Sequence, residues 1–286
     1  MKTGVIGLGA MGAGMALNLH RHGHLHRLYN RTAFRAEGLA AETGVARAMS
    51  MEELAADCEL ILISVSADQD VIDVVERIAP SVTADTIVVD TSTVSSETAR
   101  KTAAILARSK ADFLDAPVSG GVEGAAAGSL AMMVGGSAAV FARAHETLTA
   151  IAARIEHIGP TGSGQACKAV NQIMVAGINQ AVTDALAFGA CLGLNMDKVI
   201  EVIARGAAAN WFLDHRGKTM LAGDYEKGFK VKLHHKDLLI CTEMARNVNL
   251  PLPIIEATLR QYRRLMAEGQ GEKDISALYR LKKTQE

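Results

Sequence analysis

The rhythm of strand-like and helix-like segments changes near residue 160, and this change constrains the fold more than any other feature. Between the strand-like runs lie Ala-rich amphipathic segments such as 51–56, 71–78 and 97–106, long enough for crossover helices. This alternation predicts an α/β domain with a doubly wound, mainly parallel sheet. The strand-like runs are residues 5–6, 25–29, 60–65, 86–90, 113–114, 130–134 and 155–158.

The second part of the chain reads as helix alone. A cluster of turn residues at 159–164 closes the last strand-like run, and from Gln165 onward only helix-length segments follow, separated by glycines and prolines. We therefore expect an N-terminal Rossmann-type domain over residues 1–162 and an all-helical C-terminal domain over 163–286. No charged residue occurs between Ala169 and Thr183, so this stretch is expected to form a buried helix.

The charge balance argues against several classes of partner. Thirty basic and 31 acidic residues leave a formal charge of −1, without the basic excess that nucleic-acid binding requires. No apolar stretch approaches the roughly 20 residues that span a bilayer. The chain begins directly on a strand-like segment without an export signal, so we expect a cytoplasmic protein with no nucleic-acid or membrane partner.

The cysteines and histidines do not form a convincing metal site. The four cysteines are far apart, and no Cys-x-x-Cys pair occurs. The nearest approach to a metal signature is the alternation of His20, His22, His24 and His26, which spans an expected helix end and strand start. We expect reduced cysteines and no metal.

A glycine-rich turn follows the first strand-like run. The letters GLGAMG stand between that strand and an apolar-periodic helix, which is the full context of a dinucleotide-binding turn. The first glycine permits the tight turn, the second lets a pyrophosphate approach the backbone, and the third allows close helix packing. The expected contributors are Gly7, Leu8, Gly9, Ala10, Met11 and Gly12.

The end of the second strand bears on the choice of cofactor. An NAD-preferring enzyme usually has an acidic residue here for the ribose hydroxyls, whereas this chain has Asn30, Arg31 and Thr32. Arg31 can pair with a 2′-phosphate and lie against adenine, and the Thr32 hydroxyl can assist. We therefore expect NADP(H) to be preferred over NAD(H). The alternative is that Arg31 is a solvated loop residue and both cofactors bind.

Two further segments have the chemistry of a substrate site. Ser119, Gly120 and Gly121 follow a short strand and supply a hydroxyl and unobstructed N–H groups suited to a carboxylate, although a plain turn explains them equally well. Lys168 and Asn171 share one helix face at the start of the chargeless stretch. A desolvated lysine loses proton affinity and can act as general acid and base near neutral pH, whereas a lysine at a helix start is usually a solvated charge.

Four motifs in the same order resemble the signatures of the β-hydroxyacid dehydrogenase family. They are GLGAMG at 7–12, DAPVSGG at 115–121, GQACKAVN at 164–171 and HKDL at 235–238, and they cover essentially the whole chain. The family includes 3-hydroxyisobutyrate dehydrogenase, tartronate semialdehyde reductase and glyoxylate or succinic semialdehyde reductases, with 6-phosphogluconate dehydrogenase as a larger relative. The resemblance implies an NAD(P)-dependent oxidoreductase that interconverts a short semialdehyde or oxo acid and its hydroxy acid.

The resemblance also implies roles for individual residues. Lys168 is the expected catalytic acid and base, Asn171 orients the reacting oxygen, and Ser119 to Gly121 bind the substrate carboxylate. Thr93 is expected on the nicotinamide side of the cofactor, and Lys236 reaches the substrate and cofactor from the helical domain. Phe229 and Trp211 are candidates for the apolar wall that selects the substrate, with core packing as the alternative.

Other functions fit the sequence less well. An imine reductase resembles this family with the catalytic lysine replaced, so Lys168 argues against it, and 6-phosphogluconate dehydrogenase has a longer helical domain. A non-catalytic scaffold or reader with this fold has no need of Lys168, Asn171 and Ser119 together. The apolar helical domain favours a homodimer or homotetramer. The substrate and the reaction direction stay open.

Overall fold

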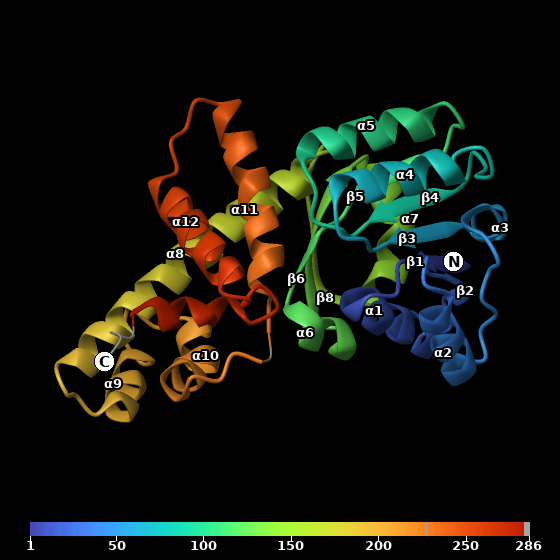
Figure 1. The fold of residues 1–286 in the computed structure, drawn as a ribbon. Coiled ribbons are helices and arrows are strands. Elements are labelled where there is room, and N and C mark those ends of the chain that lie inside the picture. Colours follow the sequence, from blue (N-terminus) through green and yellow to red (C-terminus); the bar gives the residue numbers. More distant parts are fainter. Residues whose placement is uncertain (227, 283–286) are drawn as a thin grey trace. The chain divides into compact units, whose positions relative to one another are not determined.

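A computed structural model describes residues 1–226 and 228–282. The contacts within the chain divide it into two compact units, Met1–Lys168 and Ala169–Glu286, called here the Rossmann unit and the helical unit. The expected α/β architecture with a helical C-terminal part is confirmed (Figure 1). The predicted domain limit at residue 162 stays a prediction.

One sheet organises the Rossmann unit. Its strand order is β2-β1-β3-β4-β5-β7-β6, and β8 pairs with β7. The first five strands in this order are mutually parallel, whereas β7 runs antiparallel to β5 and β6. The two-residue strand β6 was not expected, and it includes Ser119 of the segment that was expected to bind a carboxylate. The strands are β1 (Thr3–Ile6), β2 (Leu25–Tyr29), β3 (Leu60–Ile63), β4 (Ile87–Asp90), β5 (Asp112–Asp115), β6 (Val118–Ser119), β7 (Leu130–Gly136) and β8 (Ala152–Gly159).

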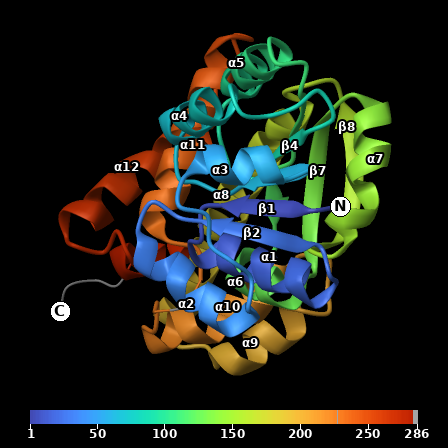
Figure 2. The same ribbon diagram turned by 90° about the vertical axis from the view of Figure 1, so that its right-hand side faces the viewer.

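Helices cover both faces of this sheet. The helices α1, α2, α6 and α7 share one hydrophobic core with the sheet, and α3, α4 and α5 share the other. Figure 2 shows α1 and α2 on one side of β1 and β2, with α3 and α4 on the other. The helices are α1 (Ala10–Arg21), α2 (Ala33–Thr43), α3 (Met51–Asp57), α4 (Asp68–Ile78), α5 (Ser96–Ala107), α6 (Gly121–Ala127) and α7 (Ala138–Thr149).

Strand β3 shows why the two cores form. Leu60 and Leu62 point into the first core, whereas Ile61 and Ile63 point into the second, because successive side chains of a strand face opposite sides of the sheet. All four are fully buried. A strand covered on both faces needs a continuous apolar run, and this requirement makes such strands readable from the sequence.

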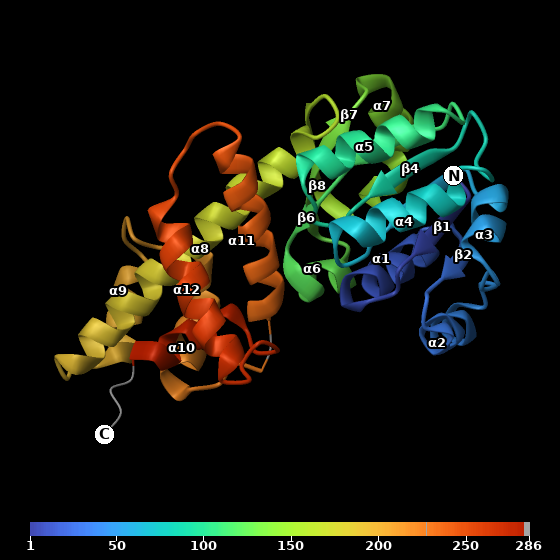
Figure 3. The same ribbon diagram turned by 45° about the horizontal axis from the view of Figure 1, so that its top comes forward.

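The helical unit contains no strand among the residues that the structure describes, only an isolated bridge between Lys230 and Asp274. Its core gathers apolar residues from α8, α9, α10, α11, α12 and η1. Figure 3 shows α11 and α12 beside α8. The helices are α8 (Ser163–Cys191), α9 (Met196–Ile203), α10 (Trp211–Ala222), α11 (Val231–Arg246), α12 (Pro253–Ala267) and the 3₁₀ helix η1 (Ile275–Lys282).

Helix α8 differs in one respect from the expectation. Its stretch between Ala169 and Thr183 was expected to be buried on all sides, but Val170 and Met174 are 59% and 61% exposed, because the surrounding helices cover only part of its apolar surface. By length and composition α8 could also cross a membrane, a test that core helices pass as well. Its buried Asn179 donates a hydrogen bond to the Ile275 carbonyl at 2.9 Å, and Gln180 bonds Thr258 of α12, which is the behaviour of a core helix.

Candidate functional site

The turn between β1 and α1 is closed by contacts that only glycine permits. Gly7 has a φ of +96°, and a Cβ there would lie 2.1 Å from the Ser64 carbonyl oxygen. A Cβ on Gly12 would lie 1.9 Å from the Gly7 carbonyl oxygen. At Gly9, in contrast, the nearest atom to a Cβ is Nη1 of Arg35, 4.0 Å away. Neighbouring backbone therefore leaves no space for a side chain at Gly7 or Gly12, whereas space remains at Gly9.

The same turn has the electrostatics of a phosphate site. Helix α1 begins at Ala10, and Gly9 caps it without any side-chain hydrogen bond. The first turn of α1 has no acidic residue, so the N–H groups and the positive end of the helix dipole face no competing carboxylate. These residues fit the pyrophosphate of a dinucleotide, with Leu8 and Met11 beside the glycines as expected.

The three residues after β2 have different surroundings. Asn30 accepts a hydrogen bond from the Leu8 N–H at 2.8 Å and donates one to the Thr32 carbonyl at 3.0 Å, so its amide holds the glycine-rich turn. The side chain of Arg31 is 91% exposed and its Nη1 lies 3.7 Å from Asp70, an exposed pair that holds it weakly. Thr32 caps α2 without a side-chain bond.

Arg35 was missed by the sequence analysis. Its guanidinium is the nearest group to the open position at Gly9, which places a second cation beside the glycine-rich turn. The only sequence signal was its position in the first turn of the helix that follows Arg31.

Thr93 lies in the turn between β4 and α5 and is partly buried. Its neighbours are held tightly: Thr91 donates to the Ile63 carbonyl at 2.8 Å, and Ser92 accepts from the Val65 N–H at 2.9 Å. This turn thus follows the carboxyl end of β4 and is hydrogen-bonded to the carboxyl end of the neighbouring parallel strand β3. The carboxyl edge of the strands is where doubly wound folds bind ligands.

The segment Ser119–Gly121 begins at β6 and continues into α6. Ser119 pairs with Ala131 of β7, and Gly120 and Gly121 have φ of +128° and +67°. Both glycines are exposed and Ser119 is partly exposed. The positive φ angles explain why this segment needs two consecutive glycines, and they leave its backbone without side chains at the surface.

Lys168 and Asn171 lie three positions apart near the start of α8, on one face of the helix. Lys168 is only 7% exposed, so the residue is largely shielded from water. The amide of Asn171 donates to the Gln172 side chain at 2.8 Å. Asn171 therefore points its amide along the helix surface, where it is partly exposed.

Asp115 anchors the start of α8 and was not singled out from the sequence. Its two carboxylate oxygens accept hydrogen bonds from the Gly162 and Gln165 N–H groups at 2.7 and 2.9 Å. Burial is the largest influence on Asp115 and raises the pKa of its carboxyl, while the backbone donors act in the opposite direction. The signal available in the sequence was its place at the head of the DAPVSGG motif.

In the helical unit Lys236 is paired with its neighbour. Its Nζ lies 3.0 Å from Oδ1 of Asp237, and Oδ2 of Asp237 accepts from the Gln172 amide at 2.6 Å. Asp237 is 4% exposed. Lys236 was expected from the sequence, whereas Asp237 and Gln172, which connect α11 to α8 within this unit, were not.

Trp211 and Phe229 belong to the same network of the helical unit. Trp211 is 60% exposed, stacks on His215, and has the Arg216 guanidinium 5.4 Å from its ring centroid. Arg216 in turn lies 3.6 Å from the buried Asp274, which accepts from the Phe229 N–H at 2.7 Å. Core packing is thus a poor description of Trp211, whereas Phe229 is partly buried near His234.

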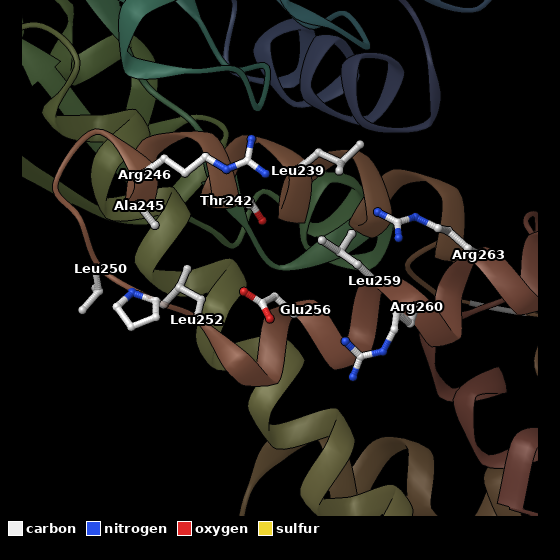
Figure 4. Close-up of a pocket in the computed structure, with 11 residues that line it drawn as sticks. Leu239, Thr242, Ala245, Arg246, Leu250, Leu252, Glu256, Leu259, Arg260 and Arg263 are labelled. Carbon is white, nitrogen blue, oxygen red and sulfur yellow. The ribbon is translucent and has the colours of Figure 1, made fainter.

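A hollow of about 420 Å³ lies between α11 and α12 of the helical unit. Leucines and the arginines Arg246, Arg260 and Arg263 line it, as Figure 4 shows. None of the residues expected to bind substrate or cofactor lines this hollow, so its position gives no support to a substrate site there.

The histidines near the end of α1 have protein partners. His22 lies 2.9 Å from the Asn18 carbonyl oxygen, and His26 lies 3.1 Å from Asp57. Within residues 1–226 and 228–282 no group of three His, Cys, Asp or Glu side chains is placed to hold a metal ion, and the four cysteines are free thiols.

Comparison with protein families identifies the class of protein. Residues 2–159 match the NAD binding domain of 6-phosphogluconate dehydrogenase, and residues 162–282 match the NAD-binding domain of NADP-dependent 3-hydroxyisobutyrate dehydrogenase. The fold and these matches define an NAD(P)-dependent dehydrogenase. The chain belongs to the β-hydroxyacid dehydrogenase family, as the resemblance of its four motifs predicts.

Individual relatives are similar over nearly their whole length. The chain is 33% identical to 2-hydroxy-3-oxopropionate reductase of Escherichia coli (strain K12), covering 97% of this chain and 96% of that one. It is 32% identical to 2-(hydroxymethyl)glutarate dehydrogenase of Eubacterium barkeri, covering 98% and 94%. The solved structure of Mycobacterium tuberculosis 3-hydroxyisobutyrate dehydrogenase with L-serine has a TM-score of 0.91 at 30% identity, covering 99% and 100%.

Proposed function

We propose that this enzyme is an NADP(H)-preferring dehydrogenase or reductase that interconverts a short semialdehyde or oxo acid with its hydroxy acid. The observation that carries the proposal is the burial of Lys168, at 7% exposure, on the helix that starts at the Asp115 anchor. Burial disfavours the charged form of a lysine and makes proton exchange near neutral pH accessible to it.

The cofactor preference rests on charge. Arg31 and Arg35 flank a turn that has no acidic residue at the end of β2 or in the first turn of α1. A 2′-phosphate gains two cationic partners there, whereas the ribose hydroxyls of NAD lack the usual carboxylate. Asn30 supports the proposal indirectly, because its amide fixes the turn through the Leu8 N–H. NAD(H) remains usable as a second, weaker cofactor.

Each catalytic role follows from the chemistry of the side chain. The nicotinamide cofactor, when bound, supplies or accepts the hydride. Nζ of Lys168 donates a proton to the carbonyl oxygen during reduction and removes it from the hydroxyl during oxidation, and Asn171 orients that oxygen. Ser119, Gly120 and Gly121 bind the substrate carboxylate through the hydroxyl and backbone N–H groups. Thr93 and Lys236 contact the cofactor side of the site, and Lys236 also contacts the substrate.

The substrate class follows from the relatives. Their names include a hydroxy-oxo acid and a hydroxymethyl diacid, and one structure contains L-serine, a 3-hydroxy acid with an amine. All are short acids, so we propose a small carboxylate-bearing substrate, with Trp211 and Phe229 as the residues that select its side chain. We also propose a cytoplasmic homodimer or homotetramer, supported by the exposed apolar residues of α8.

The test is a substrate panel with a catalytic control. Oxidation of NADPH, with NADH in parallel, is measured against glyoxylate and against succinic, tartronate and methylmalonate semialdehydes. The reverse reaction is measured with 3-hydroxyisobutyrate, L-serine and 2-(hydroxymethyl)glutarate. One acid should exceed the others clearly, with NADPH preferred. Lys168→Ala should lower kcat by roughly three orders of magnitude, with NADPH binding intact.

Four outcomes overturn separate parts of the proposal. Turnover retained by Lys168→Ala excludes its acid-base role. An NADPH affinity unchanged by Arg31→Ala, and also by the double variant with Arg35→Ala, removes the 2′-phosphate assignment. Turnover of a cyclic imine in place of every acid favours the alternative of an imine reductase, and complete inactivity with no cofactor binding favours a non-catalytic scaffold.

A further inference from the structure

Gln165 holds both sides of the turn that contains Thr93. Its Nε2 donates to the Ser92 carbonyl at 2.8 Å, and its Oε1 accepts from the Val94 N–H at 3.1 Å. Gln165 is 1% exposed, so water does not compete for these bonds. Two bonds from one carboxamide to the residues before and after Thr93 fix the backbone of Thr93 relative to the first turn of α8.

The first turn of α8 is itself immobilised on the sheet. Asp115 accepts from the Gln165 N–H and from the Gly162 N–H, so the backbone of Gln165 is held as well as its side chain. Ser96, at the start of α5, donates to the Gly162 carbonyl at 2.8 Å. A Cβ on Gly164 would lie 2.4 Å from the carbonyl oxygens of both Asp115 and Met133, so the helix starts directly against β5 and β7.

Lys168 follows Gln165 by three positions, within one turn of the same helix. The bonds that fix Gln165 therefore fix the helix turn that carries Lys168. We propose that Gln165 is a positioning residue, which keeps the Thr93 turn and the Lys168 turn at one fixed spacing so that proton transfer and hydride transfer occur at the same carbon–oxygen bond. This inference rests on the function proposed above for Lys168 and Thr93.

The proposal has a clear physical basis. A displacement of about 1 Å between reacting groups can reduce a rate by about 100-fold, so a residue that sets a spacing can matter as much as one that touches the substrate. Gln165 joins segments that are 71 to 73 residues apart in the sequence.

The first experiment compares Gln165→Leu with Asn179→Leu. Leucine keeps the approximate size of each amide and removes its hydrogen bonds, and Asn179 is a fully buried amide of the helical unit that also donates to a backbone carbonyl. Gln165→Leu should lower kcat about 100-fold while KM for the acid changes less than about threefold, because Ser119 to Gly121 are untouched. Asn179→Leu should lower the melting temperature but keep kcat.

Hydrogen exchange gives a readout that does not depend on turnover. In the cofactor-free protein, Gln165→Leu should increase amide exchange of residues 92–95, whereas Asn179→Leu should not. Unchanged exchange there overturns the positioning role whatever the enzyme's substrate. Faster exchange with an unchanged kcat also overturns it, since the turn would then be ordered by Gln165 without consequence for catalysis.

A second variant keeps the test decisive if Gln165→Leu does not fold. Gln165→Glu retains the acceptor for the Val94 N–H but can donate to the Ser92 carbonyl only when protonated. The charged groups nearest to it are the Asp115 carboxylate, bonded to the Gln165 N–H, and the Asp90 carboxylate, bonded to the Ser92 N–H, which both favour protonation, whereas Lys168, three positions along the helix, opposes it. The ratio of the variant's kcat to the wild-type kcat should rise as the pH is lowered, and a ratio independent of pH overturns the proposal.

The outcomes separate this inference from the proposed function. Full activity of Lys168→Ala contradicts the proposed function, whereas hydrogen exchange still decides whether Gln165 orders the Thr93 turn. An inactive Lys168→Ala together with a fully active Gln165→Leu leaves the proposed function in place and overturns the positioning role alone.

Discussion

The packing inside the Rossmann unit differs from the packing inside the helical unit, and the glycines of each unit show the difference. In the Rossmann unit, a Cβ on Gly7, Gly12 or Gly164 would strike a backbone carbonyl at 2.4 Å or less. In the helical unit, Gly189 and Gly217 approach only side chains, and Gly177 has nothing within 4 Å. The glycine-rich turn and the start of α8 are thus shaped by backbone packed against backbone, whereas Gly189 and Gly217 of the helical unit pack against side chains.

One buried polar group from each unit shows the same contrast. In the Rossmann unit, the carboxylate of Asp115 is bonded to backbone N–H groups of a turn and a helix start. In the helical unit, Tyr262 is fully buried between the Asn179 amide at 3.2 Å and the His234 ring at 3.0 Å. A backbone-built region tolerates few substitutions at its contact points, whereas a side-chain network weakens in steps as its members are removed.

The largest effect is expected from Gly12→Ala in the Rossmann unit. The new methyl group would lie 1.9 Å from the Gly7 carbonyl, so the glycine-rich turn must open. We expect a loss of about 3 kcal/mol in the free energy of unfolding, the upper part of the usual range for overpacking, together with loss of NADPH binding. Denaturant unfolding and a fluorescence titration with NADPH measure both.

Gly38→Ala is the matched control for this variant. Gly38 lies inside α2 with nothing within 4 Å of a Cβ, so alanine should stabilise the protein by about 0.5 to 1 kcal/mol. If Gly12→Ala behaves like Gly38→Ala, backbone contact does not govern the Rossmann unit and the contrast between the units is lost.

A smaller effect is expected from Tyr262→Phe in the helical unit. Nε2 of His234 lies 3.2 Å from the Gln172 carbonyl, so the other ring nitrogen accepts from the Tyr262 hydroxyl, which in turn accepts from Asn179. Removing that hydroxyl leaves two buried groups short of a partner, and the free energy of unfolding should fall by about 1 to 3 kcal/mol. NADPH affinity should not change.

Tyr279→Phe provides the comparison for Tyr262→Phe. Tyr279 is also buried, but its hydroxyl makes no hydrogen bond to any residue in 1–226 or 228–282. Its removal should therefore cost little. Equal losses from the two variants would show that the hydrogen bonds of the Tyr262 hydroxyl add nothing to the stability of this unit.

The smallest effect concerns acid stability at the surface of the helical unit. Hydrogen bonds from Lys230 and Lys232 lower the pKa of Glu272 from 4.5 to about 2. A lowered carboxyl pKa contributes stability that is present above pH 4.5 and is lost as the pH falls toward 2. Glu272 is exposed, so Glu272→Gln should shift the acid unfolding midpoint upward only slightly. A large shift would mean that surface charge rivals the buried network.

The fold could be predicted because its determinants are local. Strands such as β3 are continuous apolar runs, and the helices between them have amphipathic spacing, so both can be read within a short window. The strand β6 was missed because two residues carry no periodic signal. The incomplete burial of α8 was also missed. The absence of charged residues shows that a helix is apolar, but it does not show how much of the helix surface neighbouring helices cover.

The candidate site was predictable where a short sequence motif determines the local backbone geometry. The glycine-rich turn has this property, because the positions that must lack a Cβ follow from one strand–turn–helix unit. Asp115 and Gln165 act on residues about 50 and 70 positions away, and no window of sequence contains both partners. Arg35 was missed for the related reason that its role depends on how α2 folds back toward Gly9.

The path of α8 limits how this enzyme can be recombined with its relatives. The compact units meet at Lys168 and Ala169, inside a helix of 29 residues, and that junction separates Lys168 from Asn171. In a chimaera joined at this point, one turn of α8 would come from two different parent enzymes. Lys168 would then come from one parent and Asn171 from the other. Splicing in the turn before Ser163 would transfer α8 whole, but the Asp115 anchor would then have to suit a foreign helix. Exchange of substrate specificity between such enzymes therefore requires α8 and its anchor to be inherited together.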